Sequence, residues 1–158
     1  FSRLIKAYRE LNTDYKLYLV GSKLKSFSDT KLAEKNYNKN IIFTGYLKDN
    51  DLIKLYNKAS IFIYASLFEG FGMPPLEAQA CGCPCIVSYK TSLPEVYLDS
   101  VEYCDPKSVK SINEKLKYLI EDKKRKTELV NKGYKNITRY SWNSSTIKLI
   151  SIIEKEML

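Results

Sequence analysis

The sequence of 158 residues contains no histidine. Histidine is the commonest general base of enzymes and the commonest metal ligand of proteins. A self-contained Ser-His-Asp or Cys-His active site is therefore excluded within this chain.

Long hydrophobic runs are missing as well. The longest nearly apolar stretch is Ala59–Phe68, whereas a membrane-spanning helix needs about 20 apolar residues. No basic stretch followed by an apolar one resembles a signal peptide. Hydrophobic residues make up 44% of the chain and charged residues 28%, as in an ordinary globular domain. The first residue is not Met, so we expect a piece of a larger protein.

Acidic residues are outnumbered, but unevenly. The net charge is +8, and residues 105–158 hold 13 of the 26 basic residues and 7 of the 18 acidic ones. Ile61–Cys104, by contrast, holds one basic residue and five acidic ones. A nucleic-acid-binding protein would more often place its basic residues in its glycine-rich loops. A solvated, soluble surface is the favoured explanation of the charge.

Cysteine occurs only four times, at positions 81, 83, 85 and 104. Three of the four form the sequence CGCPC, where a C-x-C-x-C metal site is one interpretation. Small buried thiols in a reducing compartment are the favoured one.

The hydrophobic pattern alternates between short apolar runs and amphipathic stretches, which predicts an α/β fold. Expected strands are Leu17–Val20, Ile41–Thr44, Ile61–Ala65, Cys85–Ser88 and Glu102–Cys104. Expected helices are 1–11, Asp29–Tyr37, a helix capped by Asp49 or Asp51 and reaching Ala59, Pro74–Ala80, Leu93–Tyr97, Val109–Glu121, Arg125–Tyr140 and Asn143–Met157 capped by Ser141. Such alternation predicts a Rossmann-like parallel sheet with helices on both faces and a helical C-terminal tail. The apolar face of that tail should pack back on the sheet or reach toward another domain.

The segment Ser66–Pro84 carries the chemistry. It follows a buried strand, at the edge where α/β folds bind ligands. Glu69 lies in a glycine-containing loop, and the helix that starts near Pro74 points its positive end into the same crevice, which suits phosphate. Glu77 can reach this crevice too. Two other interpretations are open: Glu77 complements the helix dipole and Glu69 is an ordinary loop acid, or the two carboxylates form the acid/base pair of a hydrolase.

Two motifs add a resemblance. EGFGMPPLEAQACGCP, with Glu69 and Glu77 eight positions apart, is followed by SLPEV at Ser92–Val96. Together they resemble the retaining GT-B glycosyltransferases of family 4 (glycosyl transferases group 1), and the resemblance covers nearly the whole chain. It implies the C-terminal, donor-binding domain of a two-domain enzyme.

The resemblance also implies roles for individual residues. The catalytic candidate is Glu69, which would contact hydroxyls of the donor sugar, while Glu77 would bind the ribose. Donor sugar and diphosphate would be bound by Gly21, by the backbone of Gly70, Phe71, Gly72 and Met73, and by the amide of Leu76. Tyr46 and Leu47 would flank the nucleotide base, although Tyr46 is equally well explained as a packed loop aromatic.

The chain departs from the family pattern at several points. The family usually has glycine near Leu98, methionine near Gln79 and an aliphatic residue near Cys85, and we interpret these differences as packing drift. The family's first strand, its cationic pair for the diphosphate and its N-terminal acceptor domain have no counterpart in the sequence. We therefore expect a strand from upstream of Phe1 or from a partner chain to lie between Leu17–Val20 and Ile61–Ala65.

The resulting hypothesis is a retaining, metal-independent glycosyltransferase that needs no cofactor. It would use a nucleotide-diphosphate sugar and an acceptor glycan, lipid or protein, in the cytoplasm or at the inner face of a membrane with which the parent protein associates peripherally. A non-catalytic Rossmann-type nucleotide-binding module is the alternative, although its G-x-G-x-x-G motif is absent. Binding of nucleic acid is disfavoured by the acidic motif segment.

Overall fold

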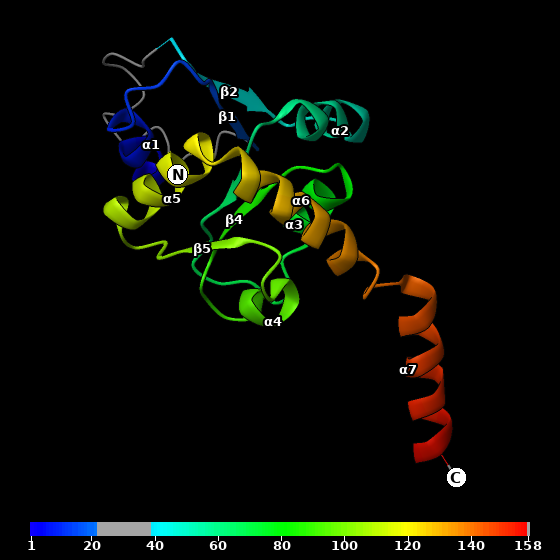
Figure 1. The fold of residues 1–158 in the computed structure, drawn as a ribbon. Helices are drawn as coiled ribbons and strands as arrows, with labels where there is room; N and C mark the ends of the chain where they lie inside the picture. The colour runs from blue at the N-terminus through cyan, green and yellow to red at the C-terminus, as the bar shows by residue number, and fades with distance from the viewer. Residues whose placement is uncertain (22–38, 158) are drawn as a thin grey trace.

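The structure, a computed structural model, describes residues 1–21 and 39–157. Its strands are β1 (Leu17–Val20), β2 (Ile41–Gly45), β3 (Phe62–Tyr64), β4 (Cys85–Ser88) and β5 (Glu102–Cys104). Its helices are α1 (Ser2–Arg9), α2 (Asp49–Lys58), α3 (Met73–Ala80), α4 (Leu93–Tyr97), α5 (Val109–Glu121), α6 (Lys123–Ile137) and α7 (Trp142–Glu156) (Figure 1). The helix predicted at Asp29–Tyr37 lies outside the described residues.

All described strands pair in parallel, and they form two sheets. β1 pairs with β2, with Leu17 opposite Ile41, and the second sheet has the order β3-β4-β5. This arrangement confirms the predicted fold class and the neighbours expected within each sheet. Within the described residues β1 and β3 are not hydrogen-bonded to each other. The extra strand expected between them stays a prediction.

Strand β4 divides the hydrophobic core into two layers. Successive side chains of a strand point to opposite faces. Accordingly, Ile86 packs with α1, α5 and the β1-β2 sheet, whereas Cys85 and Val87 pack with α2, α3 and α4. Every residue of β4 is buried, as expected for a strand covered by helices on both faces.

Several predicted boundaries are wrong by a few residues. The side chain of Asp122 caps α6 by accepting a hydrogen bond from the Arg125 amide at 2.8 Å, so this helix starts at Lys123 rather than Arg125. Helix α2 has Lys48 at its N-cap and no side-chain cap, so Asp49 and Asp51 lie inside its first turn and complement the helix dipole instead.

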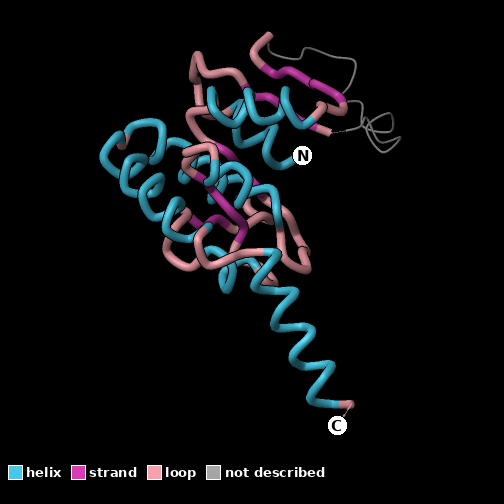
Figure 2. Tube along the Cα trace, turned by 90° about the vertical axis from the view of Figure 1, so that its right-hand side faces the viewer, coloured by secondary structure: helices cyan, strands magenta, loops and turns pink. Residues whose placement is uncertain are grey.

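Exposure was misjudged at both ends of the chain. Phe1 precedes α1 and is 59% exposed, although the predicted helix included it. Helix α7 is capped by Ser141 as predicted, but none of its residues is buried. Both views show α7 projecting away from the sheets (Figures 1 and 2), so the first of the two expected arrangements, packing back on them, is not seen. The second, contact with another domain, stays a prediction. None of the helices in the described ranges is long and apolar enough to cross a membrane.

Candidate functional site

The candidate site is built at the carboxyl ends of β3 and β4. The chain leaves β3 at Tyr64, crosses a loop and enters α3 at Met73. Gly72 is the N-cap of α3 and has a left-handed backbone, with φ of 84°. A Cβ atom at this position would lie 2.5 Å from Cδ2 of Leu93. Both the backbone and the space therefore require glycine at position 72.

Hydrogen bonds from the end of β4 and from the segment after it hold this loop in place. The Ser88 hydroxyl donates to the Ser66 carbonyl at 2.6 Å. Thr91 accepts from the Glu69 amide at 3.1 Å, and the Ser92 hydroxyl donates to the Glu69 carbonyl at 3.0 Å. Both backbone groups of Glu69 are thus bonded to the neighbouring loop, which fixes its Cα position.

The backbone amides that follow Glu69 have no protein acceptor within the described residues, and Gly72, one of this group, is buried. Across the described part of the chain, no acceptor is hydrogen-bonded to the amides of Gly70, Phe71, Gly72 and Met73. The carbonyl of Gly72, by contrast, accepts a hydrogen bond from the hydroxyl of Tyr97. Consecutive free N–H groups beside a helix N-terminus are a recurrent anion site.

Leu76 was expected to contribute an amide to the same anion. Its side chain is buried, and its backbone amide interacts with the Tyr97 hydroxyl. Pro74 and Pro75, which precede it, have no N–H groups. The helix thus offers fewer free amides than the loop does, and the role of Leu76 stays a prediction.

Each of the two carboxylates accepts a hydrogen bond from a tyrosine. The Tyr64 hydroxyl donates to Oε1 of Glu69 at 2.5 Å, and the Tyr56 hydroxyl donates to Oε2 of Glu77 at 3.3 Å. The ring of Phe62 lies between the two tyrosines, with centroids 5.3 Å from Tyr56 and 6.1 Å from Tyr64. Glu69 and Glu77 are therefore both hydrogen-bonded to tyrosines of one aromatic cluster.

Both tyrosines stay protonated at physiological pH. Burial raises the pKa of Tyr64, and the hydrogen bond to Glu69 raises it further. Burial likewise raises the pKa of Tyr56, together with the negative charge of Glu77 and the hydrogen bond to it. Each hydroxyl is therefore a donor toward its carboxylate.

The residues predicted around the base, and Gly21 predicted beside the diphosphate, follow the strands of the other sheet. Gly21 follows β1 and donates its amide to the Gly45 carbonyl at 3.0 Å, while Tyr46 is 80% exposed just after β2. No hydrogen bond within the described residues joins Gly21, Tyr46 or Leu47 to the Glu69 loop. The structure thus links Glu69 and Glu77 through tyrosines and a shared phenylalanine, and the binding roles of all these residues stay predictions.

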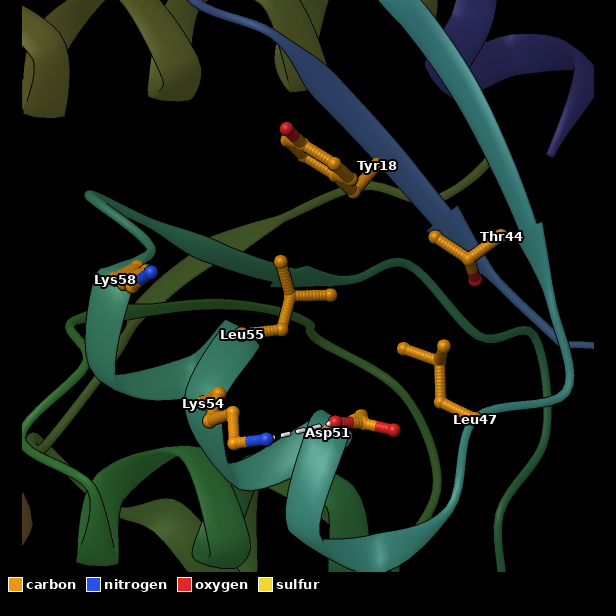
Figure 3. A pocket seen from close by; sticks show the side chains of 7 residues that line it. All are labelled: Tyr18, Thr44, Leu47, Asp51, Lys54, Leu55 and Lys58. Atoms are coloured by element: carbon orange, nitrogen blue, oxygen red, sulfur yellow. Dashed lines mark hydrogen bonds and ion pairs between the residues drawn. The ribbon is translucent and has the colours of Figure 1, made fainter.

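A cavity of about 260 Å³ lies between α2 and the β1-β2 sheet (Figure 3). It is lined by Tyr18, Thr44, Leu47, Asp51, Lys54, Leu55 and Lys58. Only Leu47 among the predicted site residues lines it. Lys54, on its rim, is paired with Asp51 at 3.0 Å. The cavity thus includes one of the two residues predicted beside the base and neither carboxylate.

The cysteines behave as packing residues. Cys83, Cys85 and Cys104 are buried, and all four thiols are free. Burial raises the pKa of Cys83 to about 12 and that of Cys104 to about 11, so these thiols are inert near neutral pH. No cluster of potential metal ligands occurs within residues 1–21 and 39–157.

The sequence profile of the family described as glycosyl transferases group 1 matches residues 1–136. The chain belongs to this family. It is 33% identical over 154 residues to the O-antigen chain mannosyltransferase B of Escherichia coli, covering 94% of this chain and 40% of that protein. The chain thus spans two-fifths of the length of this curated relative.

Solved structures include proteins of similar fold. The C-terminal domain of a glycosyl transferase group 1 family protein (LpcC) from Francisella tularensis is 29% identical, with a TM-score of 0.73, over 87% of this chain and 76% of that one. Anabaena Alr3699/HepE in complex with UDP and glucose is 18% identical, with a TM-score of 0.81, over 98% of this chain and 44% of that one. The second likeness concerns the fold alone.

Two departures from the pattern of this glycosyl transferase family have structural consequences. Gln79 is 2% exposed and bridges elements: it donates to Ser100 Oγ at 2.8 Å and accepts from Asn136 at 3.0 Å. It therefore forms a buried polar network, which is more than packing drift. Leu98 has φ of 48° and is half exposed, a backbone that favours the glycine expected there.

Sequence reasoning missed the groups that hold the backbone and the carboxylate of Glu69. Tyr64 was treated only as an apolar strand position, and Thr91 was not considered. Ser92 was noted in the motif SLPEV without a role. The signal that could have found Tyr64 is a hydroxyl at the carboxyl end of an otherwise apolar strand, next to the acidic loop.

Proposed function

We propose that this chain is the donor-binding, C-terminal half of a retaining glycosyltransferase of family 4. The parent protein would transfer a sugar from a nucleotide-diphosphate sugar to an acceptor glycan, lipid or protein. The similarity to a domain described as C-terminal in Francisella tularensis supports the assignment to this half. The named mannosyltransferase relative supports sugar transfer, and its greater length leaves room for an acceptor-binding part.

One observation carries the proposal: four consecutive free amides lie between two carboxylates that tyrosines hold. The backbone amides of residues 70–73 suit the diphosphate, because these neutral N–H groups can donate hydrogen bonds to its oxygens and carry no anion of their own. Carboxylates suit sugar and ribose hydroxyls, which are good donors to charged acceptors. A nucleotide-diphosphate sugar presents these groups in the same order: ribose, diphosphate, sugar.

The same groups would assist departure of the nucleoside diphosphate. Negative charge develops on the leaving diphosphate as its bond to the sugar breaks, and preorganised amides stabilise it. The positive end of α3 adds to this effect. We propose that the reaction needs no metal ion, because the amides, the helix end and the family's cationic pair would meet this charge.

The base would lie near Tyr46 and Leu47, and Gly21 would border the diphosphate. The neighbouring cavity, lined by Leu47 and Tyr18, offers apolar contact for a planar ring. The complex of Alr3699/HepE with UDP supports a uridine nucleotide as one candidate. GDP is the other candidate that we would test first.

The parent protein would work in the cytoplasm, where nucleotide sugars are the donors, and would meet acceptors through another domain. Peripheral contact with a membrane is part of the proposal where the acceptor is a lipid. Nucleic acid is not a proposed partner, because the acidic residues cluster at the site.

Titration calorimetry tests the proposed function. The protein should bind UDP or GDP, and Glu77→Ala should weaken that binding by about 1.5–3 kcal/mol, the value of a hydrogen bond to a charged acceptor. Glu121→Ala is the matched control, since Glu121 is an exposed acid on α5. Unchanged affinity in Glu77→Ala would contradict the assigned role. Binding of NAD in place of either diphosphate would favour the Rossmann-module alternative.

A further inference from the structure

The side chain of Glu69 has a single anchor. Its backbone is held by Thr91 and Ser92, but these bonds leave the carboxylate free to rotate about the side-chain torsions. In the described residues, only the Tyr64 hydroxyl is hydrogen-bonded to the carboxylate, at Oε1. The second oxygen, Oε2, has no such partner within the same residues.

The anchor is itself rigid. Tyr64 ends β3, where it pairs with Val87 of the fully buried strand β4. Its ring stacks on Phe62 at 6.1 Å and lies 3.8 Å from the position that a Cβ atom of residue 72 would occupy. A tyrosine ring has only two side-chain torsions, so a packed ring fixes its hydroxyl.

We propose that Tyr64 is a positioning residue that orients Glu69 toward the donor sugar. This inference rests on the proposed function, because it takes Glu69 to be the carboxylate that contacts the sugar. The phenol occupies Oε1 and leaves Oε2 to accept a hydroxyl of the sugar. Without the phenol, the carboxylate rotates among several orientations, and sugar binding must restrict it.

The raised pKa of Tyr64 agrees with a permanent donor. The phenol therefore keeps its proton, and remains a hydrogen-bond donor, near neutral pH. Tyr56 holds Glu77 in the corresponding way through a longer contact of 3.3 Å. The two tyrosines thus orient carboxylates for different parts of the ligand. Tyr64 orients the one that binds the donor sugar, and Tyr56 orients the one that binds the ribose.

The test compares Tyr64→Phe with Tyr56→Phe in the full-length protein that carries this chain. Tyr103→Phe is the control, since it also removes a hydrogen-bonding phenol, but one that donates to the Leu98 carbonyl at 2.6 Å and to neither carboxylate. Calorimetry measures affinity for UDP and GDP and for UDP-glucose and GDP-mannose, and an assay with the accepted donor measures kcat and KM.

Tyr64→Phe should bind the nucleoside diphosphate as the unsubstituted protein does, and should lose about tenfold in the affinity gained from the sugar. Tyr56→Phe should weaken the nucleoside diphosphate and the nucleotide sugar by the same factor. In a double-mutant cycle, Tyr64→Phe should have almost no further effect once Glu69 is replaced in Glu69→Ala. A merely structural role would weaken all ligands together and leave the two substitutions additive.

Equal affinities of Tyr64→Phe and the unsubstituted protein for the nucleotide sugar overturn the inference, as do additive effects in the cycle. If Tyr64→Phe does not fold, Tyr64→Leu, which also removes the hydroxyl, gives the same comparison, with loss confined to the sugar. Failure of the unsubstituted protein to bind any diphosphate or nucleotide sugar overturns the proposed function and this inference with it. Normal diphosphate binding with an unaffected Tyr64→Phe overturns the inference alone.

Discussion

Replacement of Gly72 by alanine should destabilise the protein and disturb the site together. The new Cβ atom would meet Leu93 Cδ2 at 2.5 Å, and Leu93 is completely buried, so it has little room to move. The backbone at φ of 84° adds a second cost for any residue with a Cβ. Left-handed backbone costs about 1–2 kcal/mol and overpacking about 1–3 kcal/mol, and the stiffer unfolded chain offsets up to about 1 kcal/mol. We expect a net loss of about 2–4 kcal/mol.

Gly70→Ala is the matched control for this substitution. A Cβ atom at position 70 would meet nothing within 4 Å, and no positive φ is required there. Its effect on the free energy of unfolding should stay within about 0.5 kcal/mol. Urea denaturation of the two variants measures the difference. Equal stabilities would refute the argument that the loop conformation depends on the close approach of Gly72 to Leu93.

The remaining predictions concern the positive φ of Leu98, the buried hydrogen bond between Gln79 and Asn136, the ion pairs of Glu128 and the activity of the isolated chain. Leu98→Gly should raise the free energy of unfolding by about 1 kcal/mol, because it relieves a positive φ at an exposed position, whereas Leu98→Ala should not. Asn136→Ala should cost about 1–3 kcal/mol in urea denaturation by leaving the buried Gln79 carbonyl unpaired, and the exposed neighbour variant Asn131→Ala should cost little. Hydrogen bonds from Lys132 and Arg125 lower the pKa of Glu128 to about 2, so its contribution to stability should be present above pH 4.5 and be lost as the pH falls toward 2. The slope of the urea midpoint against pH in that window should be smaller in Glu128→Gln, and high salt should reduce the difference. This chain alone should bind UDP or GDP weakly and transfer no sugar in an activity assay, and robust turnover by it would contradict the donor-half proposal.

The sequence predicted the local part of the fold well because local signals determine it. β1, β4, β5, α4 and α5 have the predicted bounds. Each is bordered by glycine, proline or a capping residue, and such residues act on the backbone next to them. The boundaries of α2 and α6 were missed where several acids or bases could serve as caps and only the three-dimensional contacts decide between them.

Exposure and long-range contacts could not be predicted in the same way. The isoleucines of α7 follow a helical period, which indicates an apolar face but does not say whether anything within the described residues covers it. The motif with Glu69 and Glu77 predicted the loop and the helix. The bonds of Glu69 to Thr91 and Ser92 join residues more than 20 positions apart, and no periodic pattern encodes them. Tyr64 lies close to Glu69 in the sequence, but it belongs to an otherwise apolar strand, so the pattern did not indicate a role for its hydroxyl.

Nuclear magnetic resonance with selective ¹⁵N-glycine labelling tests the central claim most directly. The chain has six glycines, so the spectrum of its amides is simple enough to assign by substitution. Addition of UDP or GDP should shift the amide resonances of Gly70 and Gly72, which have no acceptor within the described residues. The resonance of Gly133, which lies in α6 and packs against Gln79, should not move. Saturable shifts at Gly70 and Gly72 would support a diphosphate site in this loop. Saturable binding that leaves both amides unshifted would contradict it.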